Sequence, residues 1–140
     1  MVEIIAGEKG KGKTKHLLAR VTEDLKTVQG SIVYIDKSQK HMFELDSKVR
    51  LINMADYTIE SSDEFIGFLS GVISQNNDIE EIFLDSFLTI GYLDTNEGLV
   101  AAIEKLDVIS EKFSVKFILS VSKNQNDLPD AVRAKIIEAL

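Results

Sequence analysis

The sequence predicts an α/β fold, a three-layer α/β/α sandwich built around a mainly parallel sheet of five strands. Five short runs are rich in Ile, Val, Phe and Tyr, as strands are, and most are separated by segments with apolar residues at helical spacing. Strands that alternate with helices are joined by crossovers, which place helices on both faces of a parallel sheet. The predicted strands are Val2–Ala6, Ser31–Asp36, Val49–Met54, Glu81–Asp85 and Val115–Val121.

The helices are predicted from their apolar spacing and their end signals. The first spans Lys13–Val28, and Gly30 stands where a C-terminal stop belongs. Two more begin at capping boxes, in which a Ser or Asp is followed three residues later by Glu. These pairs are Ser61 with Glu64 and Asp94 with Glu97. Pro129 is placed as the first residue of a last helix that runs to Leu140. A short helical piece is also expected within Ser38–Leu45.

Length and composition favour one globular domain, residues 1–140. A chain of 140 residues, 44% hydrophobic, can bury one core but not two. The absence of cysteine excludes a disulfide framework and a thiolate metal site. No apolar stretch approaches the ~18 residues needed to span a bilayer. The apolar run at the start of the chain, Met1 to Ala6, is too short for a signal peptide. We therefore expect a cytoplasmic protein with no membrane partner.

The charge of the chain is unevenly distributed. The net charge of −7 argues against a general nucleic-acid binder, which would grip phosphates with clustered cations. Five basic residues nevertheless crowd one loop and the start of the next helix: Lys9, Lys11, Lys13, Lys15 and His16. A local positive spot in a negative protein suits a compact polyanion. An exposed lysine loop without a ligand is the alternative.

That loop fits a phosphate-binding motif at every fixed position. Its sequence, Gly7-Glu8-Lys9-Gly10-Lys11-Gly12-Lys13-Thr14, matches G-x-x-x-x-G-K-[ST], the Walker A pattern, and lies between a predicted strand and a predicted helix. Backbone N–H groups of such a loop converge on the β-phosphate, and the helix N-terminus adds to the field. We expect Lys13 to reach the β- and γ-phosphates, Thr14 to ligate Mg²⁺, and Lys15 to lie within the nucleotide-binding segment. The alternative is a plain glycine turn.

Asp85 is the second candidate. Ile82-Phe83-Leu84-Asp85 is an apolar run that ends in an acid, the form of a Walker B element. Mg²⁺ keeps several waters and takes few carboxylates, so Asp85 would hold the ion through its water shell. The alternative is that Asp85 only caps the following turn. Ser86 occupies the next position, where many ATPases of this kind carry a catalytic Glu, so a water-activating base must lie elsewhere.

The order of these motifs resembles the RecA-like ATPase core of the P-loop NTPases, over nearly the whole chain. In that family a glutamate after the second strand polarises the attacking water. This chain has Asp36-Lys37-Ser38 there, so the resemblance implies Asp36 as the nearest candidate base. The family's polar sensor at the end of a later strand would fall on Ser122, or on Asn124 and Gln125. The alternatives are that Asp36 caps a turn and that Ser122 is an ordinary strand end.

The resemblance also predicts the order of the strands. In a RecA-like sheet Val115–Val121 lies between the Walker A strand and the Asp85 strand, whereas in a nucleotide-kinase arrangement those two strands are direct neighbours. We expect the RecA-like order. With no sixth strand predicted, Val2–Ala6 would form the edge of the sheet, where Glu3 is tolerable.

The chain is also similar to small bacterial P-loop proteins loosely labelled twitching-motility ATPases. The motor ATPases of that name are more than twice as long and have an extra N-terminal domain and further acidic and histidine boxes. The two histidines of this chain, His16 and His41, are isolated. The label therefore adds no predicted residue.

These observations predict a protein that binds Mg²⁺ and a nucleoside triphosphate, taken to be ATP from the family resemblance. We expect slow hydrolysis and a role as a nucleotide-dependent switch or as one subunit of an assembly, with a protein partner or further copies of the chain. A small-molecule or nucleotide kinase and a non-catalytic regulator are the alternatives. A kinase closes an arginine-bearing lid over the phosphates. This chain has no insertion long enough for a lid and only three arginines, Arg20, Arg50 and Arg133.

Overall fold

The strands are among the most buried parts of the chain, and they form one six-stranded sheet. In the computed structural model, which describes residues 1–140, all five pairs of neighbouring strands are parallel. The sequence predicts five of these strands to within two residues at each end. The strands are β1 (Val2–Ala6), β2 (Ser31–Asp36), β3 (Arg50–Asn53), β4 (Ile79–Leu84), β5 (Lys116–Val121) and β6 (Ile136–Ala139).

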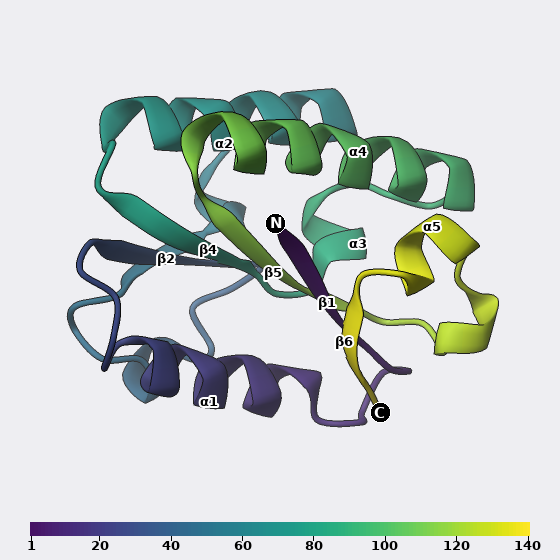
Figure 1. The fold of residues 1–140 in the computed structure, drawn as a ribbon, viewed down its shortest axis with the longest axis horizontal. Helices are drawn as coiled ribbons and strands as arrows, with labels where there is room; N and C mark the ends of the chain where they lie inside the picture. The colour runs from purple at the N-terminus through teal and green to yellow at the C-terminus, as the bar shows by residue number, and fades with distance from the viewer.

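Helices cover both faces of this sheet (Figure 1). The helix that follows the glycine loop, α1, lies on one face, and α2 and α4 lie side by side on the other. This arrangement confirms the predicted α/β/α sandwich. The helices are α1 (Lys13–Asp24), α2 (Ser62–Gln75), α3 (Phe87–Ile90), α4 (Asn96–Phe113) and α5 (Asp130–Arg133). Short 3₁₀ turns occupy Met42–Glu44, Met54–Asp56 and Gln125–Asp127, and the first of these falls within the predicted helical piece.

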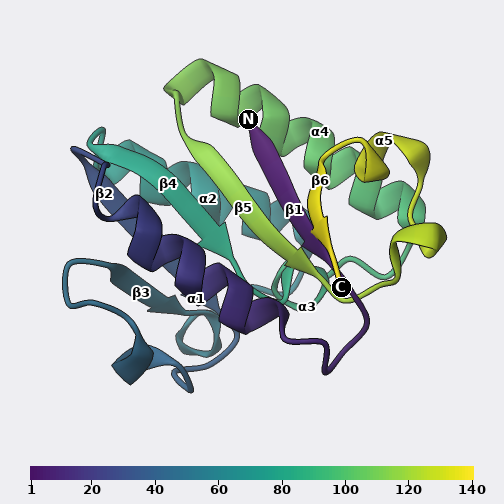
Figure 2. The same cartoon turned by 60° about the horizontal axis from the view of Figure 1, so that its bottom comes forward.

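The strand order is β3-β2-β4-β5-β1-β6. Strand β5 lies between β1 and β4, which confirms the RecA-like order. The prediction that β1 is the edge strand is wrong, because β6 pairs with its outer side (Figure 2). The residues on either side of β6 also form hydrogen bonds with β1. The Ile4 N–H donates to the Lys135 carbonyl, and the Leu140 N–H donates to the Ala6 carbonyl. Glu3 is accommodated by an ion pair with Arg20, at 2.8 Å, and does not need an edge.

Four predicted helix limits also differ from the structure. The last helix begins at Asp130, with Pro129 as its N-cap, and ends at Arg133. The rest of the tail becomes β6 because the open side of β1 offers it backbone partners. Helix α1 ends at Asp24, and the chain continues to Val28 as turns. The N-cap of α4 is Thr95, one residue later than predicted, and its hydroxyl accepts the Gly98 N–H at 2.9 Å. Ser61 caps α2 as predicted.

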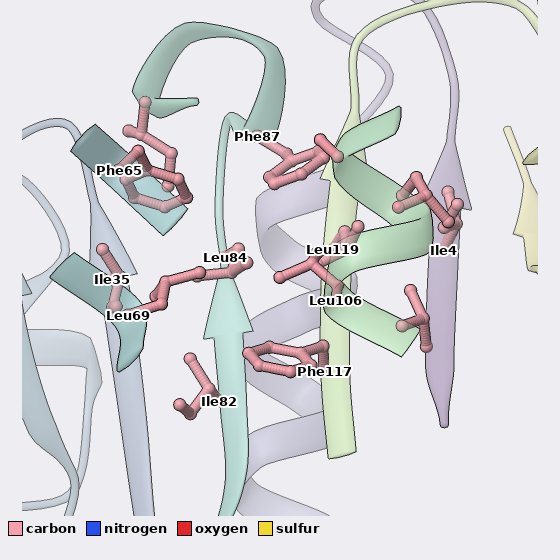
Figure 3. Packing of buried hydrophobic residues seen from close by; sticks show 14 of the residues in the cluster. Ile4, Ile35, Phe65, Leu69, Ile82, Leu84, Phe87, Leu106, Phe117 and Leu119 are labelled. Atoms are coloured by element: carbon pink, nitrogen blue, oxygen red, sulfur yellow. The ribbon is translucent and has the colours of Figure 1, made fainter. Parts of the chain in front are cut away.

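Two apolar clusters flank the sheet. The larger lies beneath α2 and α4, where Phe65 and Leu69 of α2 lie near Ile35, and Leu106 of α4 lies beside Leu119 of β5 (Figure 3). The smaller cluster joins α1 to the opposite face of the sheet. Both clusters pack the helices against the two faces of the sheet. None of the helices is both long enough and apolar enough to cross a membrane.

Candidate functional site

Residues 7–12 connect β1 to α1 at the carboxyl end of the sheet. Gly10 and Gly12 both have a φ of 89°, in the left-handed region that glycine enters without strain. Gly12 is the N-cap of α1, so the loop leads directly into the positive end of the helix. Gly7 is buried against the last residue, where an added Cβ would lie 3.1 Å from the Cβ of Leu140. The backbone thus has the curl that a phosphate-binding loop requires.

Lys13 is the one buried lysine in this loop. Its side chain is only 7% exposed, and its Nζ donates a hydrogen bond to the Glu8 carbonyl at 3.1 Å. Burial lowers the pKa of Lys13, and the nearby Asp85 carboxylate partly offsets that effect. The ammonium group is therefore held within the loop, beside the carboxylate predicted to face the metal.

Asp85 is the centre of a hydroxyl network. It is 2% exposed and follows the last residue of β4. Its Oδ2 accepts hydrogen bonds from the hydroxyls of Thr14 and Tyr34, both at 2.8 Å, and its Oδ1 accepts one from Ser120 at 2.7 Å. Three elements, α1, β2 and β5, therefore fix this carboxylate, and the contact with Thr14 joins the two predicted metal-binding residues.

Asp36 ends β2 and is 3% exposed. Its Oδ1 accepts the backbone N–H of Lys37 at 2.7 Å. Burial raises the pKa of Asp36, and the negative charge of Asp85 raises it further. A carboxylate with a raised pKa is a better proton acceptor, which is the property required of the candidate base.

These groups converge on one polar pocket with a volume of about 440 Å³. None of the 15 residues that line it is hydrophobic. Eight of the predicted site residues lie there: Lys9, Gly10, Gly12, Lys13, Thr14, Asp36, Asp85 and Ser122. Four others, Gly7, Glu8, Lys11 and Lys15, do not line it. Ser122 lies at the pocket as an exposed residue.

Several residues in the pocket or next to it were not predicted from the sequence. Lys37, Lys40 and His41 come from the segment after β2 and add basic groups to the lining of the pocket. Tyr34 and Ser120 hold Asp85 from the two strands that flank β4. Their only sequence signal is a hydroxyl within an otherwise apolar strand.

Comparison with known proteins supports the fold. Neither the models of known protein families nor the curated proteins contain a match to this sequence. Among solved structures, the chain is similar to a KaiC-like protein from the hyperthermophilic archaeon Pyrococcus horikoshii OT3, with a TM-score of 0.67 and 16% identity. The match covers 95% of this chain and 66% of that chain. The fold is RecA-like. At this identity the similarity establishes the fold and no more.

The residues present fit a magnesium ion bound together with phosphate. No group of three or more His, Cys, Asp or Glu residues could hold a metal by itself. Mg²⁺ in such a pocket takes most of its ligands from water and phosphate, with only a hydroxyl and a nearby carboxylate from the protein. Thr14 and Asp85, whose side-chain oxygens are 2.8 Å apart, match that requirement.

Proposed function

We propose that this protein binds Mg²⁺ and a nucleoside triphosphate, taken to be ATP, at the polar pocket and hydrolyses it slowly. The observation that carries the proposal is the direct contact between Thr14 and Asp85 beside the buried Lys13. Lys13 would contact the β- and γ-phosphates, and the glycine-loop N–H groups would surround the β-phosphate. Thr14 would ligate the ion, with Asp85 binding its water shell. The bound ion would neutralise charge on the phosphates.

Slow hydrolysis is proposed because the pocket has few groups to activate water or stabilise the transition state. Asp36 is its one carboxylate besides Asp85, and its raised pKa suits a proton acceptor. No arginine lines the pocket. Arg20 is bound to Glu3 and Asp24, and Arg133 is bound to Asp130. Fast turnover would therefore need a cation from a protein partner or another copy of the chain, as expected of a cytoplasmic switch or assembly subunit.

The order of the strands favours this proposal over a kinase. In the nucleotide-kinase arrangement β1 and β4 would be neighbours, whereas here β5 separates them. The similarity to proteins labelled twitching-motility ATPases contributes no residue to the site, so the proposal does not include that role.

The decisive experiment measures the binding of a non-hydrolysable ATP analogue by calorimetry, with and without Mg²⁺. Lys13→Ala should weaken binding by about 100-fold, because it removes charge-assisted contacts with the phosphates. Lys26→Ala is the matched control, since Lys26 is exposed and paired with Glu23 just beyond α1. Unchanged binding by Lys13→Ala would disprove the proposed site.

Turnover distinguishes a slow ATPase from a non-catalytic regulator. Asp36→Asn should lower the rate of phosphate release while leaving analogue binding within about threefold, since the amide keeps the shape but not the proton affinity. If phosphate release is absent in the wild type, or equal in both proteins, Asp36 is not a base.

A further inference from the structure

A second cavity lies at the other end of the sheet. It has a volume of about 720 Å³ and is bounded by the second half of α2, the amino ends of β2 and β4, and strand β3 with Tyr57, which follows it. Strand β3 is the edge of the sheet on this side (Figure 2). No residue that lines this groove also lines the phosphate pocket. Its size falls within the range of about 300–1,000 Å³ that small-molecule sites occupy.

The floor of this edge groove is apolar and includes two aromatic rings. Ile52, Phe68 and Val72 contribute apolar side chains from β3 and α2. The rings of Tyr57 and Phe68 contact each other with their centroids 5.1 Å apart. Gly71 borders open space in the groove, since an added Cβ there would meet no atom within 4 Å. A flat apolar or aromatic group can therefore lie against these rings.

Two basic side chains at this groove have no ion-pair partner. Arg50 and Lys48 line it, are exposed, and form no ion pair with any carboxylate. Arg50 differs in this respect from Arg20 and Arg133, which are both paired. None of the 13 lining residues is acidic, in a chain whose net charge is −7. The groove is thus suited to an anion, and a free guanidinium can bind carboxylate or phosphate with two parallel hydrogen bonds.

We propose that the edge groove binds a small organic anion that has an apolar, ring-bearing body. The body would pack against Tyr57 and Phe68, and Arg50 and Lys48 would bind its carboxylate or phosphate group. This site is separate from the nucleotide pocket and does not depend on the function proposed for that pocket.

The first test compares three naphthalene probes that share one body. These are 2-naphthoate, 2-naphthyl phosphate and the 2-naphthylmethylammonium cation, titrated while the naphthalene fluorescence is followed. The chain contains no tryptophan, so the protein background is low. We expect at least one anion to bind about tenfold more tightly than the cation, and the better anion identifies the preferred head group. Arg50→Gln should remove most of that difference.

The second test blocks the groove. Gly71→Leu should weaken binding of the better anion by at least about tenfold, since the new side chain would fill the space beside Val72. Gly67→Leu is the matched control, because Gly67 is exposed on the same helix, also has open space at its Cβ, and does not line the groove. Both changes replace a glycine inside a helix, so neither should impair folding.

Four outcomes would overturn the proposal. The first is equal affinity for the anions and the cation, and the second is unchanged anion binding by Gly71→Leu. The third is a dimer of the wild-type chain that Gly71→Leu dissociates, which would make the groove an interface between copies. Displacement of the anion by ATP would likewise place it in the phosphate pocket, where Gly71 has no part.

Discussion

The two ends of the sheet use their charged side chains differently. At the carboxyl end the buried charges have partners, since Asp85 accepts three hydrogen bonds and Lys13 donates one to a carbonyl. At the amino end Arg50 has no carboxylate partner, and the Oε1 atom of Glu81 is buried without any hydrogen bond. A partnered charge is fixed in position, as a site that orients phosphates requires. A buried acid without a hydrogen-bond partner favours uptake of a proton, and an exposed guanidinium without a carboxylate partner is free to bind an anionic ligand.

The largest effect expected from this comparison concerns Asp85. Asp85→Asn keeps the shape of the side chain and removes its charge, so Mg²⁺ should lose most of its influence on nucleotide binding. We expect the gain in ATP-analogue affinity produced by Mg²⁺ to fall by about 30-fold. Calorimetry with and without the ion would measure it.

Binding without Mg²⁺ serves as the internal control for Asp85→Asn. It should stay the same or improve, because a negative charge near the phosphates has been removed. Binding of the naphthalene anions in the edge groove should not change, since the groove lies at the opposite end of the strands. A full Mg²⁺ effect in Asp85→Asn would show that the ion is held by other groups.

A smaller effect is expected at Tyr34, which positions Asp85. Tyr34→Phe removes one buried donor but keeps the ring, whose centroid lies 6.0 Å from that of Phe83 in a stacked arrangement. The free energy of unfolding should fall by about 2 kcal/mol, as for the loss of one hydrogen bond to a charged group. Mg²⁺-dependent nucleotide binding should weaken severalfold, because Asp85 becomes less restrained. Urea denaturation and calorimetry would measure the two effects.

Tyr57→Phe is the matched control from the edge groove. The Tyr57 side chain is exposed and makes no hydrogen bond through its hydroxyl, so both stability and nucleotide binding should change little. If Tyr34→Phe behaves like Tyr57→Phe in both measurements, Tyr34 does not position Asp85.

The same contrast explains how much could be predicted from the sequence. The glycine loop was predictable because its residues are contiguous and each has a fixed role in binding phosphate. The hydroxyls of Tyr34 and Ser120 meet Asp85 only because β2, β4 and β5 pair in one register, and no sequence spacing encodes that meeting. The groove depends likewise on residues from α2 and three strands, so no motif marks it.

The tail shows why local pattern misled the prediction. Val132, Ile136, Ile137 and Leu140 fit helical spacing, so a helix to Leu140 was expected. The structure ends that helix at Arg133 because the outer side of β1 has unpaired backbone groups that β6 can satisfy. A tertiary requirement thus outweighed a local propensity, and only the strand order could have revealed it.

The smallest effect is expected at Glu81, the buried acid at the amino end of the sheet. Burial raises its pKa to about 7, and the neighbouring Asp24 carboxylate adds to the shift, while Arg20 and Lys116 oppose it. An unfolded Glu has a pKa near 4.5, so between these values the folded chain holds a proton that the unfolded chain has released. The contribution of Glu81 is therefore most favourable below pH 4.5 and is lost as the pH rises through about 7.

Glu81→Gln replaces the acid with a neutral amide that resembles its protonated form. The variant should therefore not lose stability at this position as the pH rises. Relative to the wild type, its free energy of unfolding should rise by about 1 kcal/mol between pH 4.5 and pH 8, after allowance for solvent screening. Urea denaturation across this range would measure the difference, with Glu104→Gln as the control because Glu104 is exposed on α4. A parallel pH dependence in Glu81→Gln and the wild type would mean that Glu81 has the same pKa in the folded protein as in the unfolded chain. The amino end of the sheet would then hold a stable buried carboxylate, and the proposed contrast between partnered and unpartnered charges would fail there.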